Sequence, residues 1–167
     1  MSVKITQVAI GVRKGSENYV SEIKNLLGAV DWIFDTVKFS GSVFGEKTES
    51  TEAKLNFNYD LIPGVEFEIL EYTDGINWHE DRGSIYSNLP FISHLGLHVD
   101  DWEEFCSLRN RLLASGCDIA QSADTFEHSN PDVPDTRRYH YLIMNTIHLF
   151  GFDLKLIYRK EVGQNDS

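Results

Sequence analysis

The chain has 167 residues, 41% of them hydrophobic, and a formal charge of −11 at neutral pH. This length and composition suit one globular unit, or two small halves that share a core. The excess of acidic side chains argues against nucleic acid and anionic membranes as partners, because like charges repel. The sequence has neither a signal-peptide pattern nor an apolar run of about 18 residues, so we expect a cytoplasmic protein.

The first half of the chain has the patterns of a strand, a helix and three further strands. Residues 3–12 alternate between two kinds of side chain, which predicts a strand. Ser16 can cap a helix that ends near Gly28. Residues 45–51 are expected to form an exposed polar turn. The three later strand patterns lie at residues 31–44, 54–60 and 65–73.

The second half repeats this plan after a linker at residues 75–90, which has no sustained periodicity. A strand at 91–99 leads to a helix that Asp100 or Asp101 can cap and that Gly116 closes. Three strand patterns follow at residues 118–127, 138–145 and 148–159. The chain therefore divides into units at 1–74 and 91–160, joined by the linker and followed by a tail at 161–167.

The two halves match each other at an offset of 87 residues. The pattern of residues 5–12 reappears at 92–99, and that of 65–70 reappears at 152–157. Self-similarity at a fixed offset is a strong indication of repeated architecture. The offset makes Gln7 equivalent to His94 and Glu68 equivalent to Lys155.

Tandem β-α-β-β-β units with these patterns resemble the vicinal oxygen chelate superfamily, which includes glyoxalase I, methylmalonyl-CoA epimerase, extradiol dioxygenases and bleomycin-resistance proteins. The best-matching pieces are Ser-His-Leu-Gly-Leu-His-Val-Asp-Asp at 93–101 and Glu-Ile-Leu-Glu-Tyr at 68–72. The resemblance implies an α+β fold in which two βαβββ modules form a glyoxalase-like incomplete barrel with a shared cavity. Strand alternation agrees, because it places His94, Gly96 and His98 on one face.

The resemblance also implies a metal site. Its members can bind a divalent ion through four side chains, which map here onto Gln7, Glu68, His94 and Lys155. The first three offer oxygen or nitrogen donors to zinc, nickel, manganese or iron. Lys155 departs from the pattern, because an ammonium group has no lone pair. The sequence therefore leaves two alternatives for the cofactor, a divalent metal or none.

Further residues are candidates for catalysis and for the cavity wall. Glu66 and Asp153 lie two residues from Glu68 and Lys155 on the same strand faces, so either carboxylate or Lys155 itself could move a proton. His128, beside a loop, is a candidate gate to the cavity. The candidate substrate-cavity residues are His98, Trp32, Phe57, Tyr59, Arg138 and His140. A solvated Arg138 and a structural His140 are the alternative interpretations.

Two functions follow from these residues. One is a metal-assisted lyase, isomerase or epimerase that acts on a small oxygenated substrate, with Gln7, Glu68 and His94 as ligands. The other is a metal-free protein that sequesters a planar or aromatic compound, as bleomycin-resistance relatives do; a Glu68–Lys155 ion pair would suit it. The three capable donors favour the enzyme. We expect a small-molecule ligand, no nucleic acid and no membrane partner, and a homodimer stays an open alternative.

Overall fold

The computed structural model describes residues 4–28, 31–85, 90–134 and 136–161. The start of the predicted first strand, the end of the predicted linker at 86–89 and the predicted tail beyond residue 161 lie outside these ranges. Within them, none of the helices has the length and apolar character that crossing a membrane requires.

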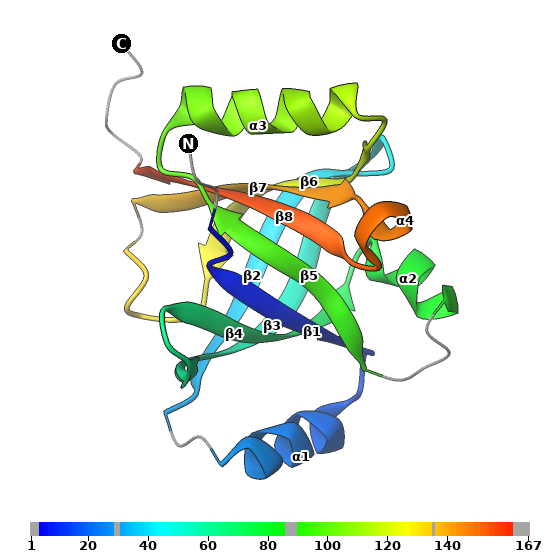
Figure 1. The fold of residues 1–167 in the computed structure, drawn as a ribbon. Coiled ribbons are helices and arrows are strands. Elements are labelled where there is room, and N and C mark those ends of the chain that lie inside the picture. Colours follow the sequence, from blue (N-terminus) through cyan, green and yellow to red (C-terminus); the bar gives the residue numbers. More distant parts are fainter. Residues whose placement is uncertain (1–3, 29–30, 86–89, 135, 162–167) are drawn as a thin grey trace.

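Eight strands close into one barrel, and helices lie around it (Figure 1). The strands are β1 Gln7–Val12, β2 Ile33–Val43, β3 Glu46–Ile62, β4 Val65–Asp74, β5 Phe91–His98, β6 Asp118–His128, β7 Arg137–Asn145 and β8 Asp153–Glu161. The helices are α1 Glu17–Leu27, α2 His79–Ile85, α3 Trp102–Ala114 and α4 Ile147–Phe150. The α+β class predicted from the sequence is confirmed.

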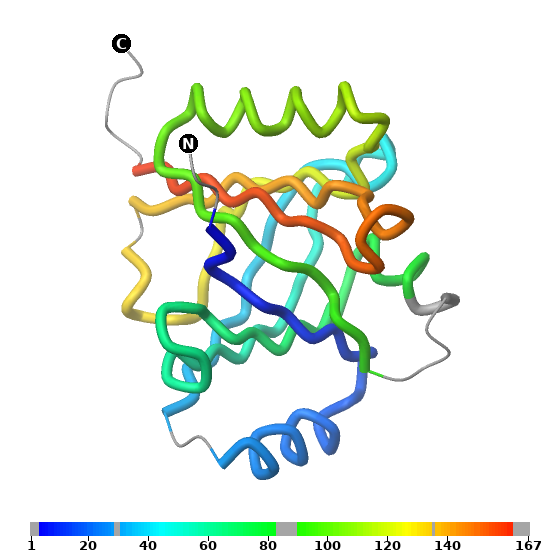
Figure 2. The backbone as a smooth tube through the Cα atoms, viewed as in Figure 1, coloured from blue at the N-terminus to red at the C-terminus, as the bar shows by residue number. Residues whose placement is uncertain are grey.

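The order of strands around the barrel is β1-β4-β3-β2-β6-β7-β8-β5. Each half of the chain contributes four neighbouring strands, and the halves meet along two antiparallel seams, β1 with β5 and β2 with β6. The path of the chain through both halves can be followed in Figure 2. The two incomplete barrels expected from the sequence therefore join into a single closed one.

The strand register carries the internal repeat. Gln7 is the parallel partner of Glu66 on β4, and His94 is the parallel partner of Asp153 on β8. His94 lies 87 residues after Gln7, and Asp153 lies 87 residues after Glu66. Because β1 and β5 are neighbours, the first strands of both halves bring these residues to one seam of the barrel.

Three segments differ from the sequence predictions. Residues 46–51 belong to β3, because Lys47 and Glu46 pair with Ser42 and Val43 of β2, and the turn shrinks to residues 44–45. The linker contains α2. Residues 147–150 form α4, so the last strand begins only at Asp153. Exposed polar alternation in a hairpin looks like a loop in sequence, and short helices lack a full hydrophobic period.

The two long helices contribute unequally to the core. Helix α3 buries Phe105 and Leu108 in an apolar cluster with residues of β5, β7 and β8. The predicted cap of this helix is confirmed, because the Asp101 carboxylate accepts a hydrogen bond from the Glu104 backbone N–H at 2.8 Å. Helix α1 buries none of its side chains, and Leu26 is 86% exposed. The second half therefore holds its helix more firmly.

We predict that Gly41→Ala destabilises the seam between β2 and β6. An added Cβ would lie 1.8 Å from the Ser122 carbonyl oxygen and 2.9 Å from the Ala123 Cα, so the strands must separate. The free energy of unfolding in urea should fall by about 1–3 kcal/mol. The control is Ser42→Ala on the same strand. An equal effect of the two substitutions would show that the seam has room at Gly41.

Candidate functional site

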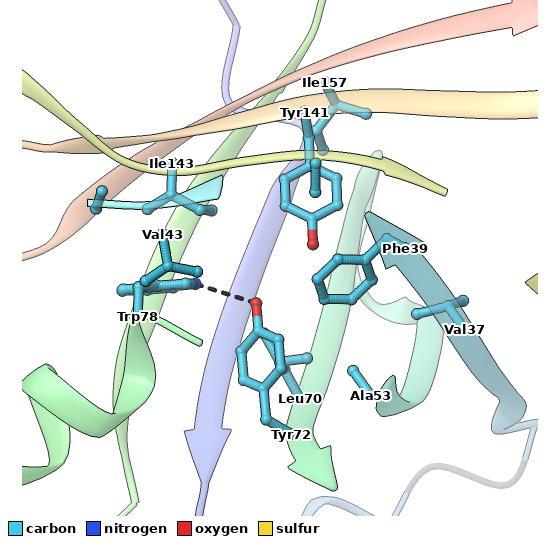
Figure 3. Close-up of a cluster of buried hydrophobic side chains, with 12 residues drawn as sticks. Val37, Phe39, Val43, Ala53, Leu70, Tyr72, Trp78, Tyr141, Ile143 and Ile157 are labelled. Atoms are coloured by element: carbon cyan, nitrogen blue, oxygen red, sulfur yellow. Dashed lines mark hydrogen bonds between the residues drawn. The ribbon is translucent and has the colours of Figure 1, made fainter. Parts of the chain in front are cut away.

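The barrel encloses a cavity of about 170 Å³ whose wall is mainly apolar and aromatic. Phe39, Tyr72 and Tyr141 lie in edge-to-face contact along it. Figure 3 shows Trp78 beside these rings, where its indole N–H donates to the Tyr72 hydroxyl at 3.1 Å. The predicted cavity residues His98, Phe57 and Tyr59 all line the same space.

A polar cluster interrupts the apolar wall at the seam of the two halves. Its members are Gln7, Glu66, Glu68, His94 and Lys155, and all five line the cavity. They come from β1, β4, β5 and β8, the strands that the repeat made equivalent. The structure therefore brings together the three predicted metal ligands, the departing lysine and one of the two predicted carboxylates.

The Gln7 amide connects the cluster. Its NH₂ group donates to Glu66 and, at 3.1 Å, to Glu68 Oε2, so its Oε1 is left as the acceptor. His94 Nε2 lies 2.7 Å from this Oε1 and must therefore carry a proton. Burial lowers the pKa of His94 well below its usual value, and Lys155 and His79 act in the same direction. His94 is thus neutral, and its 3.7 Å approach to Glu68 is not an ion pair.

The tautomer of His94 sets the hydrogen bonds of two residues behind it, Ser93 and His79. Since Nε2 is protonated, His94 Nδ1 accepts from the Ser93 hydroxyl at 2.9 Å. The Ser93 oxygen in turn accepts from His79 Nε2 at 2.8 Å. His79, on α2, is buried, and burial lowers its pKa to about 3. The sequence gives no sign of this contact, because only folding brings the linker helix against β5.

Glu68 is the most perturbed carboxyl group of the cluster. It is 1% exposed, and burial raises its pKa to about 7; Lys155 opposes the increase and Glu66 adds to it. Its Oε2 lies 4.0 Å from Lys155 Nζ. Its Oε1 has no hydrogen-bond partner among the described residues. A buried carboxylate oxygen without a partner is costly unless a ligand or a water binds it.

Lys155 is held between this carboxylate and an aromatic ring. Its ammonium lies 5.0 Å from the centre of the Tyr141 ring, in a cation–π arrangement. The side chain is 12% exposed and lines the cavity. A positive charge is therefore fixed beside the Glu68 carboxyl group, on the side of its Oε2.

These donors do not fit a divalent metal. His94 Nε2, the nitrogen that faces the cluster, is protonated and donates a hydrogen bond to the Gln7 oxygen. The Lys155 ammonium occupies the fourth position and repels a cation. Within the described ranges, no group of three His, Cys, Asp or Glu side chains could hold a metal ion. The cluster instead offers a carboxylate oxygen and an ammonium group to a ligand.

Gly96 gives Gln7 the space that it needs. A Cβ at Gly96 would lie 2.7 Å from the Gln7 Cβ and 2.8 Å from its Oε1. Gly96 is the antiparallel partner of Gln7 and the parallel partner of Lys155. A larger residue there would push the amide away from His94.

Asp153, a predicted catalytic residue, does not line the cavity. It is 1% exposed and accepts hydrogen bonds from Arg82 Nε at 2.8 Å and from the Thr146 backbone N–H at 3.0 Å. Strand alternation gave its face correctly, but Asp153 is the first residue of β8 and lies at the end of the barrel. The ion pair ties α2 to β8, a role that we infer to be structural.

Three predicted cavity residues also lie elsewhere. Trp32 packs edge-to-face on Phe67, with Lys24 over its ring, and does not line the cavity. Arg138 and His140 alternate with the cavity-lining Tyr139 and Tyr141 of β7, so they face outward. His140 bonds to Asp124 at 2.9 Å, and its ring contacts Trp102 and Phe105 of the α3 region.

The candidate gate, His128, lines the cavity together with Asp35. The two side chains come from β6 and β2, across the other seam between the halves. The sequence suggested His128 from its place beside a loop, but nothing in it pointed to Asp35 as its partner.

No protein-family model matches this sequence, and a comparison with curated proteins gives no significant match. Solved structures match the fold. A variant of 4-hydroxymandelate synthase from Streptomyces coelicolor has a TM-score of 0.53 and 13% identity, over 96% of this chain and 49% of that one. This chain therefore spans about half the length of that enzyme.

Two further structures are similar over nearly their whole length. A variant of methylmalonyl-CoA epimerase from Streptomyces coelicolor, in complex with 2-nitronate-propionyl-CoA, has a TM-score of 0.51 and 11% identity, over 94% of this chain and 95% of that one. A hypothetical protein from Bacillus halodurans has a TM-score of 0.50 and 11% identity, over 99% and 100%. The closed barrel of repeated halves, together with these similarities, shows that the chain has the glyoxalase-like fold expected from its sequence.

Proposed function

We propose that this protein is an isomerase or epimerase that moves a proton next to a carbonyl group of a small, largely apolar molecule. The observation that carries the proposal is the free Oε1 of Glu68, a buried carboxylate oxygen in an aromatic-walled cavity. An ammonium group lies 4.0 Å from the other oxygen. A base and a fixed positive charge are the two groups that enolate chemistry needs.

The proposed step balances without a redox partner. The Glu68 carboxylate takes the proton from the carbon next to the carbonyl, and the electron pair of that bond forms an enolate. The Lys155 ammonium stabilises the negative charge that develops on the enolate oxygen. The protonated Glu68 then returns the proton to the same carbon or to its neighbour. Neutral His94 and the Gln7 amide keep the carboxyl group in place, since Gln7 donates to it at 3.1 Å.

The pKa of Glu68 supports this role. A general base works best when its pKa lies near the working pH, and burial raises that of Glu68 to about 7. Lys155 opposes this increase in pKa and so keeps part of the Glu68 carboxyl groups ionised. Metal ligation, expected from the superfamily, is not part of this proposal, because the donor set does not fit an ion.

A ligand-binding protein without catalysis is the second candidate. The rings of Phe39, Tyr72 and Tyr141 and the apolar residues around them form a wall that suits a flat, apolar compound. In this case the Glu68–Lys155 pair would only orient the ligand. Proton exchange separates the two candidates, because a ligand-binding protein without catalysis would bind compounds without exchanging their protons.

The test of the proposed function is hydrogen–deuterium exchange next to the carbonyl of small aryl ketones and substituted thioesters in D₂O, followed by NMR. The natural protein should accelerate exchange, and the rate should rise with pH through about 7 as Glu68 ionises. Glu68→Gln should slow exchange by about 100-fold or more. Glu103→Gln, on the exposed first turn of α3, is the control. Unchanged exchange in Glu68→Gln would rule out Glu68 as the base.

The pH dependence of stability gives an independent check on Glu68. Its pKa is higher in the folded state than in the unfolded state, so its contribution to stability is present below about pH 4.5 and is lost as pH rises to about 7. The stability of the natural protein relative to Glu68→Gln should therefore fall over this window, by about 3 kcal/mol at most. His79 and His94 act in the opposite sense but are present in both proteins. A constant difference in the free energy of unfolding between the two proteins across this pH range would contradict the raised pKa.

The metal prediction concerns Lys155. The natural protein should bind zinc weakly, and Lys155→Glu should bind it more than about tenfold more tightly, because two unit charges 4 Å apart interact by about 4 kcal/mol at an effective dielectric near 20. Titration calorimetry measures both affinities. Lys47→Glu, an exposed site with the same charge change, is the control. Tight zinc binding by the natural protein would overturn our assignment of the cluster.

A further inference from the structure

We propose that Asp35 and His128 form a second polar subsite in the cavity, which binds a neutral hydroxyl group of the ligand. The inference extends the proposed function, on which it rests for the position of the carbonyl group, by assigning the substrate class: an elongated, apolar molecule with a carbonyl at one end and a hydroxyl at the other.

The subsite is built around a fully bonded carboxylate. Asp35 is 3% exposed, and its Oδ2 lies 2.8 Å from His128 Nδ1. Its Oδ1 accepts hydrogen bonds from the backbone N–H groups of Ser129 and Asn130 at 2.8 and 2.9 Å, and from the Ser129 hydroxyl at 3.2 Å. These donors hold the carboxylate ionised and in one orientation, so it acts on the ligand only through His128.

The carboxylate fixes the tautomer of His128. An ionised Asp35 accepts a hydrogen bond from Nδ1–H, so the neutral form of the ring has its lone pair on Nε2, on the far side of the ring. The side chain of His128 is 9% exposed and lines the cavity. Nε2 is buried and has no hydrogen-bond partner among the described residues. The Asp35 contact anchors the turn after β6, but it leaves Nε2, in a side chain that lines the cavity, without a partner among the described residues.

The position of the subsite gives the length of the ligand. Asp35 lies on β2 and Glu68 on β4, with β3 between them. Two strand spacings are on the order of 10 Å. Leu55 on β3 and Leu70 on β4 line the cavity on this side, and Tyr141 lines it on the side of the second half. The ligand therefore meets apolar wall between two polar ends.

The charges favour a neutral hydroxyl over an anionic group at this end. Among the described residues that line the cavity, the acidic side chains are Asp35, Glu66 and Glu68, and Lys155 is the only Lys or Arg. An anion next to His128 would also lie near the ionised Asp35. A hydroxyl group donates a hydrogen bond to Nε2 without adding charge, and it completes the one hydrogen bond that the ring lacks.

The experiment uses 4-hydroxyacetophenone, 4-methylacetophenone and 4-acetylbenzoate as probes, which share a ketone and differ at the other end. Affinities are measured by NMR titration. The natural protein should bind the hydroxyl probe tighter than the methyl probe by about tenfold or more. His128→Phe should remove this preference, and His128→Gln, which keeps an acceptor, should retain part of it. His140→Phe is the matched control, because His140 also bonds to an aspartate but faces outward.

A second measurement needs no substitution. The hydroxyl probe should shift the ¹⁵N signal of His128 Nε2 in the natural protein, and the methyl probe should not. Equal affinity for both probes, tighter binding of the carboxylate probe, or no saturable binding of the hydroxyl probe would overturn the inference. The titrations are repeated with Glu68→Gln, where the hydroxyl preference should persist. Failure of proton exchange alone thus counts against the proposed function and not against this subsite.

Discussion

The arrangement of the candidate site depends on one buried amide, that of Gln7. It donates to two carboxylates of the first half of the chain and accepts from His94 of the second half. Because an amide has distinct donor and acceptor ends, these contacts set the proton on His94 and, through Ser93, the tautomer of His79. They also occupy one oxygen of Glu68 and leave the other without a hydrogen-bond partner among the described residues. The hydrogen bonds of Gln7 therefore determine which oxygen of Glu68, the proposed base, is left to react.

Burial and charge act in opposite directions on this oxygen. Enclosure in the barrel disfavours the ionised carboxyl group of Glu68, whereas Lys155 favours it, and the balance brings its pKa to about 7. A divalent ion at the same place would hold the carboxylate fully ionised and bind its free lone pairs. The ammonium supplies a positive charge without ligating the carboxylate. A lysine in the fourth position thus changes the chemistry available to the cluster and does not merely weaken a metal site.

Strand periodicity and the internal repeat predicted the part of the site that lies on β1, β4, β5 and β8. A period of two gives the face of each residue, and the offset gives its register, so Gln7, Glu68, His94 and Lys155 could be placed together. Periodicity gives no position along the barrel axis, which explains the wrong assignment of Asp153. Periodicity also does not show which face of β7 lines the cavity, because both faces carry aromatic rings, as at Tyr139 and His140. The contacts of His79 with Ser93 and of Asp35 with His128 join distant segments and carry no local pattern.

The repeat makes the barrel nearly symmetric, but its cavity is not. Gln7 faces a histidine at the equivalent position, and Glu68 faces a residue of opposite charge at 155. A symmetric cavity would accept a small ligand in two orientations related by the repeat. With a carboxylate on β4, an ammonium on β8 and the Asp35–His128 pair at the opposite seam, the two orientations would place a ligand against different charges at these three positions. Divergence at a few equivalent positions therefore gives the cavity two different ends within a scaffold whose strand order is the same in both halves.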